Sequence, residues 1–455
     1  MQKWDRNISG QKLVVLGAGE SGVGAAILAQ QKGYDVFVSD YGTIPKEYKK
    51  QLEDIKVPYE ENQHDETIIL KSHIVIKSPG IPQTAPIIKK VSEAGILILS
   101  EIEFAARYTD AQLIGITGSN GKSTTATLTW FILNRAGLNV GLAGNIGKSF
   151  ALQVARESYD YYVLEISSFM LDDFKEMKID IAVLLNITPD HLDRYEHKME
   201  NYAASKFKII ENQDKDSVFI YNQDDDEITK GRRKYTTSAQ QYPFTQHGQL
   251  GEGAYLDRDS NMIINVLNQD TFDMSINELA LQGKHNVYNN MASGIVAKVL
   301  ELRNESIRES MGEYQNIAHR LEHVSQIGGV NFINDSKATN VNSVWYALES
   351  MPGNVVLIMG GVDKGNDYHI LKDLVRSRVS AIVCIGKDNQ RIHEAFEDDT
   401  EIMVNTENMQ DAVTTAYHLA KKGDTVLLSP ACASFDLFKN YEDRGDQFKK
   451  AVRDL

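Results

Sequence analysis

The chain has 455 residues, of which 42% are hydrophobic and 24% are charged, and its formal net charge at pH 7 is −15. This composition is typical of a globular protein with about two to four domains. The negative charge argues against a nucleic-acid-binding surface, which needs clustered Lys and Arg side chains, so we expect no nucleic-acid partner.

The two cysteines, Cys384 and Cys432, are too few for a disulfide framework or a spaced metal site. The polar start of the chain lacks the apolar core of a signal peptide. The sequence also contains no uncharged run of about 18 apolar residues, which is the length that a membrane-spanning helix needs. We therefore expect a cytoplasmic protein with no membrane insertion, and we expect it to be a monomer.

Short runs of branched aliphatic residues alternate with helix-compatible stretches along the first hundred residues. The runs cover residues 12–16, 35–38, 73–76 and 95–99. This alternation predicts a parallel sheet covered by helices.

A glycine-rich turn, residues 17–24, follows the first of these runs, and Asp40 ends the second. Such a turn lets the backbone approach a pyrophosphate at a helix N-terminus, and the acidic residue can accept from a ribose hydroxyl. On these residues alone the ligand is NAD or another nucleotide diphosphate. A tight turn without any ligand is a further alternative.

The strongest local motif is the loop Gly118-Ser119-Asn120-Gly121-Lys122-Ser123-Thr124, between the aliphatic run 112–116 and a helix expected from Ser123 onward. Backbone N–H groups of such a loop point at phosphate oxygens, its lysine reaches the terminal phosphates, and its hydroxyl can ligate Mg²⁺. Ile116 occupies the position of the first glycine in the strict P-loop pattern, so a structural glycine turn remains an alternative.

Polar residues also follow the next aliphatic runs, 161–166 and 181–185. Glu165 ends the first and is a Mg²⁺ candidate, while His191 and neighbouring carboxylates follow the second. Because parallel strands end at one edge of a sheet, these groups should gather near Lys122. Lys206 lies in an amphipathic segment, and on sequence alone it reads as a solvated helical lysine.

Between residues 232 and 283 the sequence is rich in polar residues with short alternating runs, which predicts an antiparallel β insertion. A third aliphatic series then covers residues 330–334, 354–359, 380–385 and 425–428. Polar clusters at 319–322, 334–340 and 360–365 adjoin this series and are either surface loops or ligand sites. The series together predict an α/β protein with three domains, residues 1–102, 103–317 and 318–455.

Taken together, the motifs resemble the Mur ligase family of peptidoglycan synthesis in both order and spacing. The matching segments are residues 118–124, 165–169, 186–195, 285–286, 319–320, 335–340, 429–434 and 438–445. The resemblance implies a Rossmann-like N-terminal domain, a central P-loop ATPase-like domain and a Rossmann-like C-terminal domain.

The resemblance also implies an ATP-dependent amide ligase, and the C-terminal motifs are most similar to members that add D-glutamate to UDP-N-acetylmuramoyl-L-alanine. In that chemistry ATP converts the L-alanyl carboxylate into an acyl phosphate, which the amine of D-glutamate then opens. The first glycine turn would accordingly hold the UDP-sugar rather than NAD.

The resemblance implies roles for individual residues of this chain, assigned from one matching motif after another. The implied catalytic residues are Lys122, Glu165, His191 and Lys206. The implied ATP contacts are Gly118, Ser119, Asn120, Gly121, Lys122, Ser123, Thr124, Asn286, Asn289, Arg320 and Asp335. The implied Mg²⁺ ligands, for an expected two ions, are Ser123, Glu165, His191 and a carbamylated Lys206.

The two other substrates have their own implied residues. The UDP-sugar would contact Gly19, Glu20, Ser21, Asp40, Tyr41, Ser78, Pro79, Gly80, Asn145 and His191. D-Glutamate would contact Lys337, Thr339, Lys364, Ser434 and Tyr441. Because Tyr41 occupies a position where family members vary around the uracil, the resemblance does not fix the uracil contacts.

Two alternatives to this function remain open. Another Mur ligase or a folylpolyglutamate synthetase would use the same acyl-phosphate chemistry with a different amine. A non-catalytic regulatory protein that binds NAD and ATP belongs to a different class, but it would not need Glu165, His191 and Lys206 together.

Overall fold

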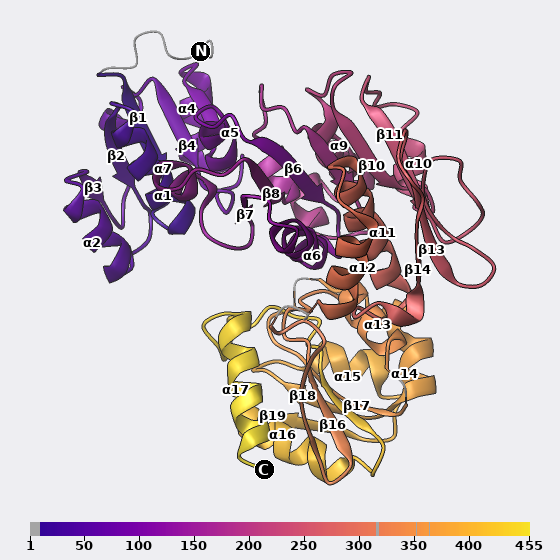
Figure 1. The fold of residues 1–455 in the computed structure, drawn as a ribbon. Helices are drawn as coiled ribbons and strands as arrows, with labels where there is room; N and C mark the ends of the chain where they lie inside the picture. Colours follow the sequence, from indigo (N-terminus) through magenta and orange to yellow (C-terminus); the bar gives the residue numbers. More distant parts are fainter. Residues whose placement is uncertain (1–9, 315–317, 352, 364) are drawn as a thin grey trace. The chain divides into compact units, whose positions relative to one another are not determined.

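The computed structural model describes residues 10–314, 318–351, 353–363 and 365–455. These residues form two compact units (Figure 1). The first unit consists of the described residues of Met1–Leu279 and Tyr288–Glu313, and the second of those of Ala280–Val287 and Tyr314–Leu455.

The first unit begins with a five-stranded sheet of order β3-β2-β1-β4-β5, in which every neighbouring pair is parallel. The strands are β1 (Lys12–Leu16), β2 (Asp35–Ser39), β3 (Tyr59–Glu60), β4 (Ile74–Lys77) and β5 (Leu97–Ser100). The helices are α1 (Glu20–Gln31), α2 (Lys46–Asp54), α3 (Glu66–Ile69), α4 (Pro86–Glu93) and α5 (Glu101–Ala106).

Alternating residues of β1 serve the two faces of this sheet, because successive strand side chains point to opposite sides. Leu13 and Val15 belong to a core shared with α1 and α5, whereas Val14 and Leu16 belong to a separate core shared with α4. The sheet is therefore covered on both faces, as the continuous aliphatic run predicted.

A nine-stranded sheet of order β14-β13-β12-β11-β10-β9-β6-β8-β7 forms the rest of the first unit. Its strands are β6 (Gln112–Thr117), β7 (Val140–Gly144), β8 (Tyr161–Glu165), β9 (Ile181–Leu184), β10 (Val218–Asn222), β11 (Gln240–Thr245), β12 (Gly253–Leu256), β13 (Asn261–Asn265) and β14 (Phe272–Ser275). The helical segments are α6 (Lys122–Arg135), α7 (Phe150–Arg156), α8 (Ser168–Leu171), η1 (Leu192–Tyr195), α9 (Met199–Phe207), η2 (Lys208–Ile210), α10 (Asp226–Gly231), η3 (Ile276–Glu278), α11 (Lys284–Val299) and α12 (Asn304–Glu313). The first turn of α11, up to Val287, belongs to the second unit.

The predicted antiparallel insertion is confirmed for β12, β13 and β14, which pair antiparallel. The strand β11 differs from that prediction, because it pairs parallel with both β10 and β12. The insertion thus extends the edge of the parallel sheet and makes it mixed.

The second unit contains a six-stranded sheet of order β15-β16-β20-β17-β18-β19, parallel except for β15. The strands are β15 (Glu322–Ile327), β16 (Val330–Asn334), β17 (Val355–Met359), β18 (Val379–Ile385), β19 (Met403–Thr406) and β20 (Thr425–Leu428). The helical segments are α13 (Val341–Glu349), η4 (Tyr368–Leu371), α14 (Lys372–Arg378), α15 (Gln390–Phe396), α16 (Met409–Leu419) and α17 (Tyr441–Arg453).

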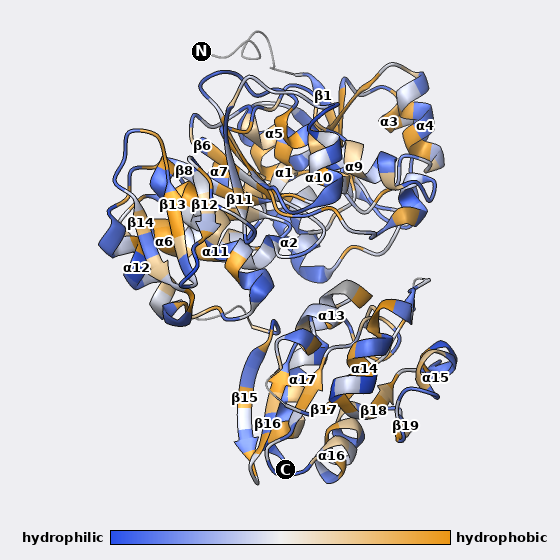
Figure 2. Cartoon of the chain, turned by 90° about the vertical axis from the view of Figure 1, so that its right-hand side faces the viewer, coloured by the Kyte–Doolittle hydropathy of each residue, from blue (hydrophilic) through white to orange (hydrophobic). Residues whose placement is uncertain are grey.

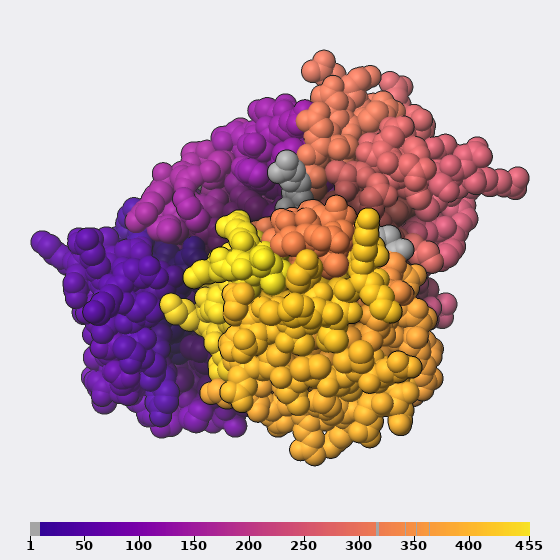
Figure 3. Space-filling model, turned by 90° about the horizontal axis from the view of Figure 1, so that it is seen from below, coloured from indigo at the N-terminus to yellow at the C-terminus, as the bar shows by residue number. Residues whose placement is uncertain are grey.

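Two cores flank this sheet. One contains residues of α13, α14 and α15, and the other contains residues of α16 and α17. The edge strand β15 is mostly hydrophilic, whereas the inner strand β17 is hydrophobic throughout (Figure 2). On the face shown in Figure 3, the atoms of this unit, orange to yellow, form a rounded and closely filled surface.

The aliphatic runs correctly predicted most inner strands, including the full bounds of β1, β16 and β20. The predicted domain boundaries stay predictions: α5 spans the first, and residue 317 lies outside the described residues. Within the described part of the chain, no helix is both long enough and apolar enough to span a bilayer.

Candidate active site

The loop 118–124 joins β6 to α6 as a strand, a turn and a helix. The helix begins at Lys122, one residue earlier than the sequence indicated, and Gly121 precedes it with φ +81°. A Cβ on Gly121 would lie 2.5 Å from Oδ1 of Asn289, so only glycine fits both the backbone angle and the space. The first N–H groups of α6 have no partners within the helix and can bind an anion.

The segment that follows β9 holds this loop in shape. Oδ1 of Asn186 accepts from the N–H of Asn120 at 2.8 Å, and Nδ2 of Asn186 donates to the carbonyl of Asn120 at 3.0 Å. Oγ of Ser119 donates to the carbonyl of Thr188 at 2.8 Å and accepts from its N–H at 2.9 Å. The loop is therefore ordered by its own protein contacts, which is the arrangement that preorganised phosphate binding needs. The sequence did not single out Asn186 for this role, although its place directly after a strand was a usable signal.

Two lysines meet at one carbonyl of the loop. Nζ of Lys122 and Nζ of Lys206 each donate to the carbonyl of Gly118 at 2.8 Å. Lys206 lies on α9 and is only 1% exposed. Burial, together with the charge of Lys122, lowers the pKa of Lys206 well below its ordinary value, against the opposing effect of Asp190 and Asp172. On sequence alone Lys206 was interpreted as a solvated helical lysine. In the structure it is instead a buried amine beside the loop 118–124.

Glu165 ends β8 with its side chain buried, and β8 is the direct neighbour of β6. Its Oε1 accepts from Nδ2 of Asn145 at 2.9 Å, whereas its Oε2 is buried without a hydrogen-bond partner among the described residues. A buried carboxylate oxygen without a donor is costly, and a hard cation such as Mg²⁺ would satisfy it. Ser123, buried in the first turn of α6, supplies a hydroxyl of the kind Mg²⁺ also accepts, so these residues fit the ion.

The described residues contain no group of three or more His, Cys, Asp or Glu that could hold a metal. The predicted Mg²⁺ set has only Glu165 and His191 of these types, so this finding does not test it. His191 directly precedes the segment η1 and has φ +53°, and its ring packs edge-on against Phe169 with the ring centres 5.0 Å apart.

Arg194, three residues further along η1, connects this segment to the five-stranded sheet. It donates to the carbonyls of Pro79 and Gly80 at 3.2 and 2.8 Å, and its guanidinium lies 4.2 Å from the ring centre of Phe169. The predicted UDP-sugar loop at Pro79 and Gly80 therefore adjoins the segment of His191, a contact that the sequence did not reveal.

The glycine turn of the five-stranded sheet is tied to its neighbours. Oδ2 of Asp40 accepts from the N–H of Ala18 at 2.6 Å, and its Oδ1 accepts from the N–H of Gly42 at 2.7 Å. Both carboxylate oxygens of Asp40 thus bind the backbone of loops at the edge of the sheet where the UDP-sugar is predicted to bind. A hydrogen bond from Asp40 to a ribose stays a prediction. Oε1 of Glu20 accepts from the N–H of Ser149 at 3.2 Å.

In the second unit, Asp335 follows β16 and is buried. It accepts from Oγ of Ser429 at 2.9 Å, and an Nη of Arg320 lies 3.8 Å from its Oδ1. Burial raises the pKa of Asp335 to about 6, although Arg320 and Ser429 oppose this effect. The predicted ATP contacts are divided between the units: Asn286, Arg320 and Asp335 belong to the second, and the others belong to the first.

The predicted amino-acid contacts also lie in the second unit. Nζ of Lys337 lies 5.5 Å from the ring centre of Tyr441, Thr339 is partly exposed and Ser434 is buried. Lys364 lies outside the described residues.

Sequence reasoning missed Arg444 as a site residue. Its side chain is completely buried, and it donates to Oγ of Ser336 at 3.0 Å, to the carbonyl of Ser336 at 2.9 Å and to that of Cys432 at 3.1 Å. It therefore ties together the loops that follow β16 and β20, where amino-acid contacts are predicted. Burial lowers its pKa to about 10, so it stays cationic at neutral pH.

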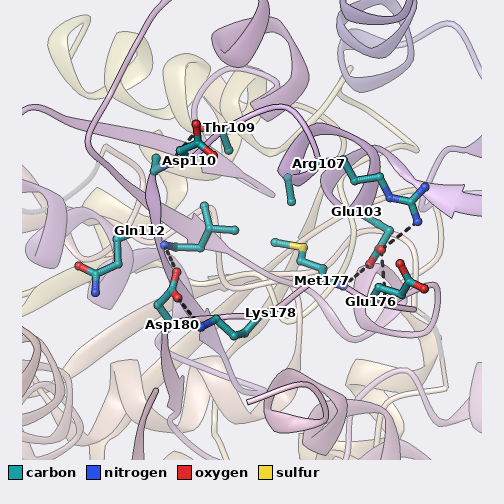
Figure 4. Close-up of a pocket in the computed structure, with 12 residues that line it drawn as sticks. Glu103, Arg107, Thr109, Asp110, Gln112, Glu176, Met177, Lys178 and Asp180 are labelled. Atoms are coloured by element: carbon teal, nitrogen blue, oxygen red, sulfur yellow. Dashed lines mark hydrogen bonds and ion pairs between the residues drawn. The ribbon is translucent and has the colours of Figure 1, made fainter. Parts of the chain in front are cut away.

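A cavity of about 500 Å³ lies at the opposite edge of the nine-stranded sheet, where β6 and β9 begin (Figure 4). Glu103 and Arg107 pair in its wall at 3.3 Å, and the N–H of Leu113 donates to Asp180 at 2.8 Å. Because the predicted groups follow the carboxyl ends of the strands, this cavity is not part of the predicted site.

Models of three protein domains match the chain. The Mur ligase MurD-like N-terminal domain matches residues 11–100, the Mur ligase middle domain matches residues 116–297, and the Mur ligase glutamate ligase domain matches residues 319–432.

Two bacterial relatives match along nearly their whole length, and both are named UDP-N-acetylmuramoylalanine–D-glutamate ligase. The protein of Christiangramia forsetii is 52% identical and that of Bacteroides fragilis 53% identical, each over 446 residues that cover 98% of this chain and 100% of the relative. Among solved structures, a pseudomurein peptide ligase type C from Methanothermus fervidus superposes with a TM-score of 0.63 at 19% identity, covering 98% of this chain and 100% of that one, which shows a shared fold. By its domains and by these relatives, the chain belongs to the Mur ligase family.

Proposed function

We propose that the chain is an ATP-dependent ligase that joins D-glutamate to UDP-N-acetylmuramoyl-L-alanine in the synthesis of a peptidoglycan precursor. Two relatives named UDP-N-acetylmuramoylalanine–D-glutamate ligase are 52% and 53% identical to this chain over 98% of its length. The observation that carries the proposal is the group formed by the phosphate loop, the two lysines at the Gly118 carbonyl and the unpaired buried oxygen of Glu165.

The reaction needs an activated carboxylate, because a carboxylate oxygen is a poor leaving group. The L-alanyl carboxylate attacks the γ-phosphorus of ATP, the bond to ADP breaks, and an acyl phosphate forms. The amine of D-glutamate then attacks the acyl carbon, phosphate departs with the C–O electron pair, and the amine loses a proton. The products are the amide, ADP and phosphate.

The residues of the chain have separate roles in this scheme. Lys122 neutralises charge on the transferred phosphoryl group, and the loop N–H groups fix the phosphates. Ser123, Glu165, His191 and a carbamylated Lys206 would hold Mg²⁺, which when bound supplies further charge neutralisation at the phosphates. We assign the uridine nucleotide to the loops that follow β1, β2 and β4, and D-glutamate to Lys337, Thr339, Lys364, Ser434 and Tyr441.

Carbamylation of Lys206 is supported by its environment. Carbon dioxide reacts with a neutral amine, and burial together with Lys122 favours the neutral form of this side chain. The product would be an anion, which suits a position between Lys122 and a cation. We further propose three domains with boundaries near residues 102 and 317, and a monomer in the cytoplasm, where ATP and nucleotide-activated sugars are available.

The test is phosphate release with ATP, Mg²⁺ and UDP-N-acetylmuramoyl-L-alanine, with D-glutamate, L-glutamate, L-alanine, L-lysine or diaminopimelate as the amine. We expect release that depends on D-glutamate, together with the matching amide. Release with another amine would retain the acyl-phosphate chemistry and overturn the assignment of D-glutamate, whereas release with none would overturn the ligase proposal.

A further inference from the structure

Two charged side chains of the first unit lie buried against each other, and the proposed reaction assigns no role to either. Lys77 is the last residue of β4, and Asp173 lies two residues after α8. Nζ of Lys77 lies 2.9 Å from Oδ2 of Asp173, and the two side chains are only 3% and 4% exposed. Because desolvation offsets most of the attraction between two buried charges, such a pair contributes little net stability. Its significance lies instead in the backbone that it holds.

Both members of the pair bind the loop 78–83, which lies between β4 and α4. Nζ of Lys77 donates to the carbonyl of Ile81 at 3.0 Å. Oδ1 of Asp173 accepts from Nε2 of Gln83 at 2.6 Å. A lysine at the base of the loop and a carboxylate that follows α8 thus hold the middle and the far end of the loop together.

Arg194 binds the first half of the same loop, at the carbonyls of Pro79 and Gly80. Its guanidinium lies 4.2 Å from the ring centre of Phe169, which is a residue of α8. The carbonyl of Ile81 is the next along the chain, so three successive carbonyls of the loop accept hydrogen bonds from cationic side chains. Each cation is in turn supported by a residue in α8 or shortly after it.

The position of this loop matters for the UDP-sugar, which the proposed function assigns to residues 78–80 and on which this inference rests. The loop packs against the glycine turn 17–24, because a Cβ on Gly17 would lie 2.4 Å from Oγ of Ser78. A shift of the loop would therefore change the surface that the UDP-sugar meets. Glu165 would stay in place, since it is fixed at the end of β8.

We propose that Lys77 and Asp173 are positioning residues for the UDP-sugar, whose ion pair holds the loop 78–83 in the conformation that binds this substrate. Both side chains are nearly inaccessible, so they act through the loop and not by touching the substrate. Without the pair the loop would adopt several conformations. The affinity for the UDP-sugar would then fall in proportion to the fraction of molecules that keep the binding conformation.

The main test replaces both residues in the full chain, as Lys77→Met together with Asp173→Leu. Two apolar side chains leave no buried charge without a partner, so the variant should fold with a stability near that of the wild type. We expect calorimetry to show roughly tenfold weaker binding of UDP-N-acetylmuramoyl-L-alanine, as for a loop that keeps the binding conformation in about one molecule in ten. The affinity for ATP should be unchanged, because the predicted ATP contacts lie outside this loop.

A second variant, Gln83→Ala, makes the same test without changing the core. Gln83 is exposed, and its replacement removes only the hydrogen bond between the loop and Asp173. It should weaken binding of the UDP-sugar by roughly threefold, the effect of one lost hydrogen bond, and leave binding of ATP unaltered.

The matched control is Lys90→Met together with Glu66→Leu. These residues form an ion pair at 2.6 Å between α4 and α3, with side chains that are 46% and 45% exposed. Removal of this pair should leave both affinities as in the wild type, because neither residue contacts the loop 78–83.

Unaltered binding of the UDP-sugar in Gln83→Ala and in the folded double variant would overturn the proposal. An equal loss of affinity for ATP would also overturn it, because the pair would then have a general structural role. Failure of the ligase proposal is distinguishable, since these affinities are measured without an amine. In that case the wild type would bind the UDP-sugar but release no phosphate with any amine.

Discussion

Lys206 shows how strongly the surroundings of one side chain can change its chemistry. A solvated lysine is a cation at neutral pH, but this amine is buried beside Lys122 and donates to the carbonyl of Gly118. Desolvation and a neighbouring like charge both disfavour the cation, so the neutral amine is accessible where carbamylation would need it.

Replacement of Lys206 by alanine should lower phosphate release by roughly 10- to 100-fold, the usual effect of removing a group that supports a metal site. Added formate or acetate should restore part of the activity, because a free carboxylate can occupy the space of the lost carbamate. A steady-state assay with and without the added acid measures the effect.

The matched control is Lys198→Ala, which removes an exposed lysine just before α9 that pairs with Glu196. It should change neither the activity nor its response to the acid. If well-folded Lys206→Ala gains nothing from any small carboxylate, the carbamate proposal is wrong.

At the scale of elements, the start of α6 depends on the backbone of Gly121. The residue has φ +81°, and its missing Cβ leaves room for Asn289, whose Oδ1 also accepts from Oγ1 of Thr125 at 3.1 Å. The geometry of the loop and the packing of α11 against α6 are therefore coupled through one glycine.

Replacement of Gly121 by alanine should destabilise the first unit and raise KM for ATP, because both backbone strain and a clash with Asn289 act on the phosphate loop. Gly137, after the other end of α6, has φ +87° with open space around its missing Cβ. Gly137→Ala should therefore cost only the strain, roughly 1 kcal/mol.

Gly121→Ala should exceed that cost by roughly 1–3 kcal/mol. Denaturant unfolding of both variants measures the difference. Equal costs, with an unchanged KM for ATP in both, would show that the close approach of Asn289 does not constrain the loop.

At the scale of the whole molecule, the five- and nine-stranded sheets belong to one unit, and buried polar contacts join them. Glu101, on α5, accepts from Oγ of Ser149 at 2.6 Å and from the N–H of Ala151 at 2.7 Å, both at the start of α7. Desolvation raises the pKa of Glu101 from 4.5 to about 7. The folded chain therefore holds this proton more tightly than the unfolded chain, and the stability from Glu101 is complete below about pH 4.5 and is lost as the pH rises through 7.

Glu101→Gln keeps an acceptor for Ser149 and Ala151 but cannot ionise. The variant should gain stability over the wild type between pH 5 and pH 8, by up to roughly 3 kcal/mol for a shift of this size. Thermal unfolding midpoints at the two pH values measure the change. Glu93→Gln, on the exposed side of α4, should leave the profile of the wild type unaltered. If the stability of Glu101→Gln depended on pH in the same way as that of the wild type, the assignment of this titration to Glu101 would be contradicted.

The sequence by itself determined the α/β class, most inner strands, the strand, glycine turn and helix around residues 118–124, and the resemblance to the Mur ligases. These features are local. An aliphatic run buried on both faces, or glycines and a lysine between a strand and a helix, can be recognised from about ten consecutive residues, because neighbouring residues alone produce the pattern. For the same reason β3 and β19 went unpredicted, because they are short and lack a buried aliphatic run: β3 has no fully buried residue and β19 has only Thr406.

The tertiary structure alone decided contacts between distant segments. Burial of Lys206 beside Gly118, the support of the loop by Asn186, the bridge from Arg194 to Pro79, and the three loop contacts of Arg444 each join residues that are far apart in the chain. Protonation states belong to this group as well, since desolvation at Lys206 and Glu101 depends on which elements pack around them. The local sequence determines which chemical groups the chain has. Long-range packing determines which of these groups are desolvated and which come into contact, because solvation and distance are properties of the folded chain.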